Sequence, residues 1–157
     1  MASPTTIRHG PLTIPLPEGW FDASQVVAMG PEEGGFRSSL VVSVEPARKG
    51  ETVEQFAARL LPGVRKVAPG FVLIAEQLAN FDGKDGVLRE YTYEIEGTVV
   101  AQLQFYLVKS EIGLTFTYTQ LASRLKDTRA VAEKFFTGTQ VTGALEALMR
   151  PSTIRGQ

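Results

Sequence analysis

Side chains able to do acid–base or metal chemistry are few in this chain, and they do not group. There is one histidine, His9, and no cysteine, so a Cys/His metal site or a reactive thiolate cannot be assembled. The serine residues lack a histidine that could activate a hydroxyl as a nucleophile. His9 itself precedes the first predicted strand and lacks the convergent partners that catalysis needs. We therefore predict that the protein is not an enzyme and has no metal site and no cofactor.

The acidic residues follow the patterns of loops and turns. Glu32 and Glu33 lie in a glycine-rich stretch, where solvated charge is the simpler interpretation. Asp82 and Asp85 flank glycines, and aspartate stabilises turns through its own side chain. Residues 83–86 superficially resemble a phosphate-binding loop, but they lack its strand–loop–helix context and its glycine spacing. These residues indicate turns and not a catalytic centre.

The strand-forming segments combine one apolar face with a second face that is neither apolar nor charged. Alternation at period two places each set on one side of a pleated sheet, and the apolar set is typical of a core. The apolar set includes Leu40, Val42, Val44, Leu103, Phe105, Leu114, Phe116 and Tyr118, and the second set includes Ser39, Val41, Ser43, Gln102, Gln104, Tyr106, Thr115, Thr117 and Thr119.

The second face indicates binding more than catalysis. Between Gly97 and Leu121 the only charged residues are Lys109 and Glu111, whereas a face left to water usually carries lysine and glutamate. Serine, threonine, glutamine, tyrosine and valine suit a dry surface that can still form hydrogen bonds. An uncharged patch marks an interface without naming its partner, so a bound client, a second subunit and a cover formed by residues 142–157 all remain open. From the alternation alone, the candidate contact residues are Val41, Gln102 and Tyr106.

Length and charge limit the classes of protein. At 157 residues we predict one domain over residues 1–141, followed by a tail over residues 142–157 with one short helix. A formal net charge of -1 gives no electrostatic argument for nucleic acid or for an anionic membrane. No apolar run approaches the ~20 residues that span a bilayer. The first residues show no basic segment followed by an apolar stretch, so a cytoplasmic protein is expected.

The element pattern predicts an α+β fold, with an antiparallel sheet and helices packed on one face. The first helix begins at Thr52, where Gln55 completes a capping box, and Pro62 predicts a kink or a break within it. Asp127 or Thr128 caps the second helix, which Gly138 ends. Glu96-Gly97 is predicted to form a tight hairpin. Residues 12–20 are predicted to form a short edge strand that ends in a turn, and the other predicted strands are 24–29, 37–45, 71–78, 87–96, 98–108 and 114–121.

Together these segments resemble the DcrB-like domain, which shares the α/β sandwich of PsbP and Mog-type proteins. The resemblance runs over roughly residues 12–136 and depends on the order and spacing of several short motifs. The residues that carry it are Leu12-Thr13-Ile14-Pro15, Pro17-Glu18-Gly19-Trp20, Asp22-Ala23-Ser24, Ser39-Leu40-Val41-Val42-Ser43, Phe56-Ala57-Ala58-Arg59-Leu60-Leu61, Pro69-Gly70-Phe71, Glu90-Tyr91-Thr92-Tyr93, Glu96-Gly97 and Gln104-Phe105-Tyr106.

Within that family the chain is most similar to the Eag chaperones of type VI secretion. The resemblance implies a homodimeric cytoplasmic adaptor that binds N-terminal transmembrane helices of a secreted effector and delivers it for loading. The alternative is a small-ligand-binding or regulatory protein-binding module of the PsbP or Mog type. By resemblance, the residues that contact the client helix are Val27, Ser39, Ser43, Leu60, Ala68 and Gln104, although Leu60 and Ala68 stand where relatives carry glutamine and leucine.

Overall fold

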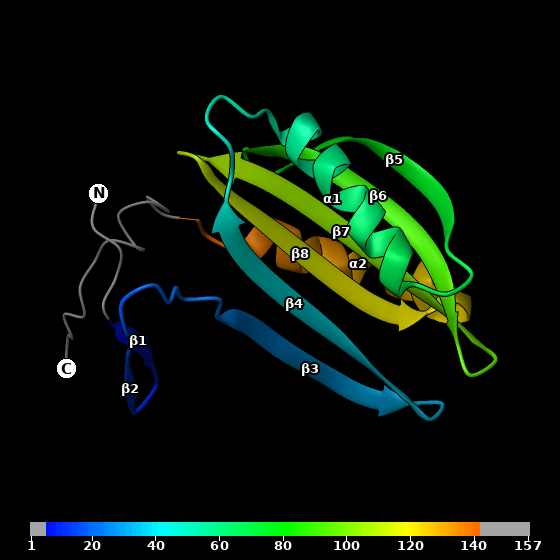
Figure 1. Cartoon of the computed structure of the whole chain (residues 1–157). Helices are drawn as coiled ribbons and strands as arrows, with labels where there is room; N and C mark the ends of the chain where they lie inside the picture. The colour runs from blue at the N-terminus through cyan, green and yellow to red at the C-terminus, as the bar shows by residue number, and fades with distance from the viewer. Residues whose placement is uncertain (1–5, 142–157) are drawn as a thin grey trace.

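The fold is built on one six-stranded antiparallel sheet with the strand order β3-β4-β8-β7-β6-β5 (Figure 1). The computed structural model describes residues 6–141. This architecture confirms the predicted α+β class and the antiparallel sheet. The strands of the sheet are β3 (Gln25–Glu33), β4 (Phe36–Pro46), β5 (Val72–Phe81), β6 (Lys84–Ile95), β7 (Thr98–Lys109) and β8 (Ile112–Leu121).

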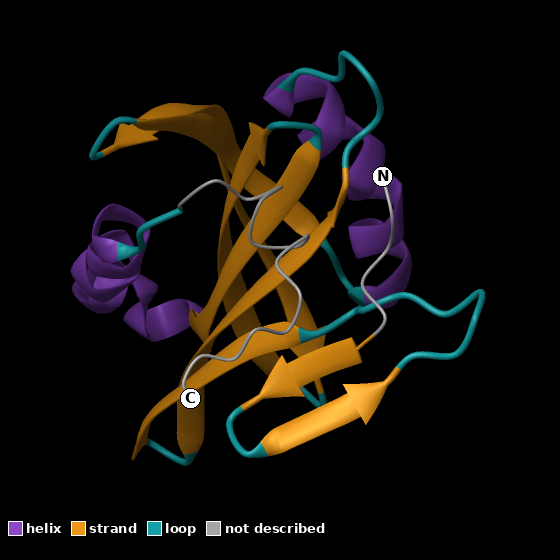
Figure 2. Cartoon of the chain, turned by 90° about the vertical axis from the view of Figure 1, so that its left-hand side faces the viewer, coloured by secondary structure: helices purple, strands orange, loops and turns teal. Residues whose placement is uncertain are grey.

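The two helices lie on opposite faces of the sheet (Figure 2). Helix α1 (Val53–Val67) packs against Tyr106, whereas α2 (Ala122–Gly138) packs over Phe105. Because successive residues of a strand point to opposite sides, these neighbours on β7 face different layers. The prediction that both helices share one face is therefore wrong. The face that the sequence indicated as polar is in fact apolar near β6, where Val87 lies beneath α1. This apolar area is enough to bury the narrow apolar stripe of α1.

Helix α1 begins as predicted and continues past the proline. The side chain of Thr52 accepts from the backbone N–H of Gln55 at 3.1 Å, and the Gln55 side chain accepts from the N–H of Thr52 at 3.0 Å. The helix runs unbroken to Val67 with Pro62 inside it, so the expected break is absent. Proline costs a helix interior about 3 kcal/mol, and the burial of Phe56 against the sheet offsets that cost.

Helix α2 begins earlier than predicted. Its N-cap is Leu121, which makes no side-chain capping hydrogen bond, whereas we expected Asp127 or Thr128. The chain turns directly from β8 into the helix, and Leu125 and Phe136 anchor it in the core. The burial of these side chains fixes the start of the helix without a polar cap. The helix ends at Gly138, as predicted.

Residues 12–15 do not form an edge of the main sheet. They form β2 (Leu12–Pro15), which pairs only with β1 (Thr6–His9) in a separate two-stranded sheet. Alternating side chains and prolines indicate an edge strand but do not say which sheet the strand joins. The hairpin projects from the body at the N-terminal side (Figure 1).

Other boundaries differ by a few residues. Strand β3 continues across an irregularity between Met29 and Glu32, in a stretch predicted as a loop. The hairpin between β6 and β7 is confirmed, with Glu96 at φ 48° and Gly97 at φ 81°, as a type I′ turn requires. The predicted short helix within residues 142–157 lies outside the described residues.

Candidate binding recess

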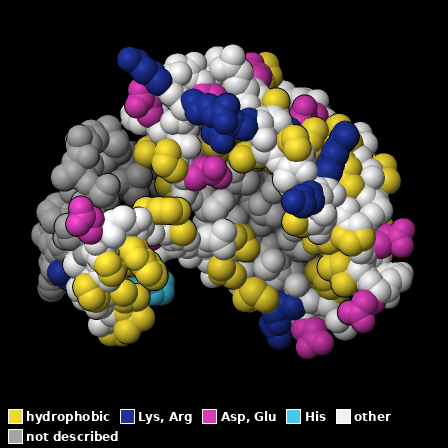
Figure 3. Space-filling view, in the orientation of Figure 1, with side chains coloured by type: hydrophobic (Ala, Val, Ile, Leu, Met, Phe, Trp, Pro, Cys, Tyr) yellow, Lys and Arg dark blue, Asp and Glu magenta, His cyan; other side chains and the backbone are white. Residues whose placement is uncertain are grey.

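Helix α1 covers only part of its face of the sheet, and the uncovered part is a recess. The strand register brings uncharged side chains from four strands together there: Val41 lies between Val27 of β3 and Thr117 of β8, and Ser39 lies beside Thr119. The space-filling view shows a hollow with white polar surface at its floor and hydrophobic side chains beside it (Figure 3). The polar recess is defined here as Val27, Ser39, Val41, Ser43, Gln102, Thr117 and Thr119.

The recess is open to contact along β3 and β4. Val27 is 56% exposed on the edge strand. Ser39, Val41 and Ser43 are half-buried, so their side chains are reachable from solvent. Three of the predicted contact residues of β4 therefore lie side by side with Val27 on one accessible surface.

Glutamine side chains of β7 run across the floor in two hydrogen-bonded lines. The Gln104 amide donates to Thr117 Oγ1 at 3.0 Å and accepts from the Tyr106 hydroxyl. The Gln102 amide donates to Thr119 Oγ1 at 2.9 Å and accepts from a tyrosine hydroxyl of β6. Each amide is thus oriented by partners on both sides, and the floor is held in place before any ligand arrives.

The first line continues beneath α1 to a buried arginine. The Arg89 guanidinium donates to the Tyr106 hydroxyl at 2.9 Å, to the backbone oxygen of Ala57 at 2.9 Å and to Glu76 at 2.5 Å. It also lies 4.9 Å from the centre of the Tyr106 ring. The series Arg89–Tyr106–Gln104–Thr117 therefore connects the helix to the floor of the recess.

Burial changes the acidity of the tyrosines in this layer. Desolvation raises the pKa of Tyr106 to about 12, against a smaller lowering by the Arg89 charge. The pKa of Tyr91 is raised further, chiefly by desolvation. Both hydroxyls stay protonated at neutral pH, so they act as hydrogen-bond donors to the glutamines and not as bases.

Three of the predicted contact residues are not accessible from the recess. Tyr106 is 0% exposed beneath α1, and Gln104 and Ala68 are each 6% exposed. Tyr106 has an edge-on contact with the Phe56 ring, and Gln104 acts as a support for Thr117 and not as a surface group. Thr117, which is half-buried, lies at the surface of the recess where the sequence pointed to Gln104. Alternation identifies the face of a residue but not which part of that face a helix covers.

Leu60 lies on the sheet-facing side of α1. It is half-buried and packs against the cluster that contains Phe56, one turn earlier on the same helical side. The Phe56 ring lies over Gly113 of β8, where a Cβ atom would stand 2.2 Å from it. Helix α1 packs on β6 and β7, with the Phe56 ring reaching the start of β8, and it leaves β4 and β3 uncovered.

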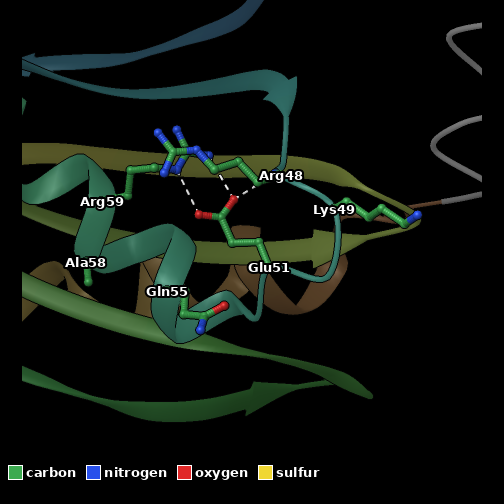
Figure 4. Close-up of a pocket in the computed structure, with 6 residues that line it drawn as sticks. All are labelled: Arg48, Lys49, Glu51, Gln55, Ala58 and Arg59. Atoms are coloured by element: carbon green, nitrogen blue, oxygen red, sulfur yellow. Dashed lines mark hydrogen bonds and ion pairs between the residues drawn. The ribbon is translucent and has the colours of Figure 1, made fainter.

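A basic pocket lies at the N-terminus of α1, beyond the Ser43 end of the recess. Its volume is about 550 Å³, and Arg48, Lys49, Glu51 and Arg59 are among its lining residues. Figure 4 shows the guanidinium groups of Arg48 and Arg59 on the same side of the Glu51 carboxylate. Arg59 donates to Glu51 at 2.7 and 2.9 Å, and this pairing lowers the pKa of Glu51 to about 2.

The alternation placed Thr117 and Thr119 on this face, but they were not among the predicted contact residues, and no role was predicted for Arg89. The sequence does indicate a role for Arg89, because it alternates with Val87 and Tyr91 on an otherwise apolar face. A charge in such a series indicates a buried hydrogen-bonding partner. The identity of that partner, a carbonyl of α1, follows only from the packing of the helix.

Over the described residues 6–141, acidic and histidine side chains form no group that could hold a metal ion. Neither described helix is long and apolar enough to cross a membrane. The pocket at the N-terminus of α1 and the pocket beside Val131 of α2 are both open to solvent.

Comparison with known proteins supports the fold. The DcrB family model matches residues 12–136. A Pseudomonas aeruginosa protein of unknown function, PA94, proposed as a regulator, has a TM-score of 0.71 at 22% identity, covering 90% of this chain and 99% of that one. The solution structure of cyanobacterial PsbP (CyanoP) from Synechocystis sp. PCC 6803 has a TM-score of 0.54 at 12% identity, covering 78% and 84%. No curated protein matches the chain.

Proposed function

This chain belongs to the DcrB family, and from that premise we propose that it is an adaptor chaperone whose polar recess binds an apolar helix of a secreted protein. In the form implied by the resemblance to Eag chaperones, the bound segment is an N-terminal transmembrane helix of a type VI secretion effector. The chaperone would act in the cytoplasm as a homodimer and hold the effector until loading.

The observation that carries this proposal is the chemistry of the recess. Its defining residues are uncharged and combine hydroxyl and amide groups with valines on β3 and β4. An apolar helix loses little by leaving water, whereas a charged ligand would meet no counter-charge on this floor. Docking of a helix into a groove is a recurrent recognition mode that buries one helical stripe.

Preorganisation of the floor supports the same function. The amides of Gln102 and Gln104 are each fixed between a tyrosine and a threonine, so binding need not immobilise them. Less conformational entropy is then lost on binding. The hydroxyls of Ser39 and Ser43 can rotate to meet polar atoms of a bound helix.

Affinity capture with matched variants tests this function. Ser43→Arg places a charge on the floor of the recess, and Ala130→Arg places the same charge on an exposed position of α2. Wild type and Ala130→Arg should retain one large protein with apolar helices near its N-terminus, and Ser43→Arg should lose it. A Ser43→Arg protein that is folded and still retains that partner would sink the assignment to the recess.

A peptide of the captured protein's apolar helix then provides a quantitative measurement. An unpaired charge in a desolvated contact costs several kcal/mol, so the Kd of Ser43→Arg should rise by about 100-fold or more. Gln104→Arg is a poorer probe, because Gln104 is buried and supports Thr117. Equal affinity of the wild type and Ser43→Arg would mean that the helix binds to another surface, whereas capture of no such protein would favour the ligand-binding or regulatory module.

A further inference from the structure

The last described residue of the chain, Val141, lies on the α2 side of the sheet near the end of β4. Val141 packs against the core cluster beneath α2, and Lys109 Nζ donates to its backbone oxygen at 3.3 Å. Lys109 pairs with Ile112, which in turn pairs with Pro46. The chain therefore leaves the described structure at the end of β4, near the end of the recess formed by Ser43.

Residues 142–157 are long enough to reach the whole recess from that point. Ser43 lies about 10 Å from Pro46 along β4, and the stretch from Ser39 to Ser43 spans about 13 Å. If residues 142–157 were helical they would span about 24 Å, and an extended chain would span more. Because the chain leaves beside the end of β4, at the border of the sheet, it can pass around that border to the α1 side without crossing a strand.

The sequence of this segment matches the chemistry that the recess selects. Residues 144–149 read Ala-Leu-Glu-Ala-Leu-Met, with Glu146 as their only charge. The spacing of Ala144, Leu145 and Leu148 would place them on one side of a helix, away from Glu146. An apolar stripe flanked by small residues is the same kind of ligand that the proposed function assigns to the recess.

We propose that residues 142–157 bind in the polar recess of their own chain, with Leu145 and Leu148 against β4 and β8, so that a client helix must displace them. Only the competition with a client helix rests on the proposed function, because occupation of the recess by this segment can be measured without a client. A short covalent connection gives an effective concentration in the millimolar range. Even a weak contact would then be populated, and it would lower the apparent affinity for a client.

Engineered cysteines test the contact, because the chain has none of its own. In the full chain, Ser43→Cys with Leu148→Cys should form a disulfide within one molecule under mild oxidation. The matched pair is Val131→Cys with Leu148→Cys, since Val131 is exposed beside an apolar pocket of about 520 Å³ on the outer side of α2. A disulfide formed only by the Val131 pair, by neither pair, or only between two molecules would overturn the proposal.

Thiol labelling provides a second measurement that does not depend on disulfide geometry. In the full chain, Ser43→Cys should react slowly with a maleimide, and adding Leu145→Asp and Leu148→Asp should raise the rate by about threefold or more. The labelling rate of Val131→Cys should not change with the same two aspartates. An unchanged rate at Ser43→Cys would show that the segment does not cover the recess, whether or not the recess binds a client.

Discussion

The guanidinium of Arg89, on strand β6, donates a hydrogen bond to the backbone oxygen of Ala57 in α1 at 2.9 Å. Both residues are buried, with Arg89 1% exposed. The same guanidinium donates to the Tyr106 hydroxyl, whose ring lies under the helix. Arg89 thus ties α1 to the sheet beside the recess.

Replacing Arg89 by methionine should destabilise the fold. Methionine keeps much of the side-chain length but leaves the Ala57 oxygen and the Tyr106 hydroxyl with fewer partners, at about 2–4 kcal/mol in total. Urea unfolding measures this loss. The control is Glu76→Gln, whose side chain is 39% exposed and still able to accept from Arg89, so its cost should stay below about 1 kcal/mol. Equal costs for the two variants would mean that the buried contacts of Arg89 do not hold α1.

Replacing Thr115 by valine should leave stability unchanged or increase it. Thr115 lies on the α1-side face beside Ser43 and Tyr106, and its hydroxyl is buried without a hydrogen-bond partner among the described residues. A buried, unpaired hydroxyl costs about 1–3 kcal/mol, and valine fills the same volume without it. A thermal melt of Thr115→Val tests this. A large fall in Tm would mean that the hydroxyl is paired in solution.

Thr117→Val is the matched comparison, because it removes the hydroxyl that accepts from Gln104, and it should lower Tm.

Periodicity predicted most of the strands, both helices and the face that carries the recess, although it missed β1 and the second half of β3. Ser39, Val41 and Ser43 alternate with core residues of the same strand, and the pairing registers place them together as expected. The sequence did not predict how much of that face α1 covers. Whether Tyr106 is surface or interior depends on where α1 lies, and the position of α1 depends on the buried Arg89 and on the space above Gly113.

The start of α2 and the free hairpin show a second limit. Capping motifs identify a helix start only where a polar cap is used, and α2 begins at Ala122 on apolar anchors instead. The edge strand predicted at the start of the chain is β2, but the sequence did not indicate that it pairs only with β1. Both points depend on tertiary context, which period and propensity do not encode.

The stability of the protein should fall at high pH through Tyr106. Burial raises the folded-state pKa of Tyr106 to about 12, whereas an unfolded tyrosine has a pKa of about 10. The contribution of the neutral hydroxyl is complete below pH ~10 and is lost as pH rises toward ~12, because only the unfolded chain releases its proton in that interval. Wild type should lose about 2 kcal/mol more than Tyr106→Phe between these values. Unfolding in urea at several pH values measures the stability of the two proteins, and absorbance at 295 nm follows the ionisation of tyrosine. The same dependence of stability on pH in both proteins would contradict the prediction.

Replacing Gly113 by alanine should shift α1 and destabilise the fold. A Cβ at this position would lie 2.2 Å from the Phe56 ring, which is fully buried, so the ring and the helix above it must move. Overpacking of this kind typically costs about 1–3 kcal/mol.

The control is Gly63→Ala on the exposed side of α1, where no atom lies within 4 Å. There alanine should stabilise the helix by about 0.5–1 kcal/mol. Opposite shifts in Tm would show that Gly113 is required for space above β8 and not for backbone freedom. If Gly113→Ala melts at or above the wild-type temperature, α1 does not rest on β8 through Phe56, and the recess beside it has a different width.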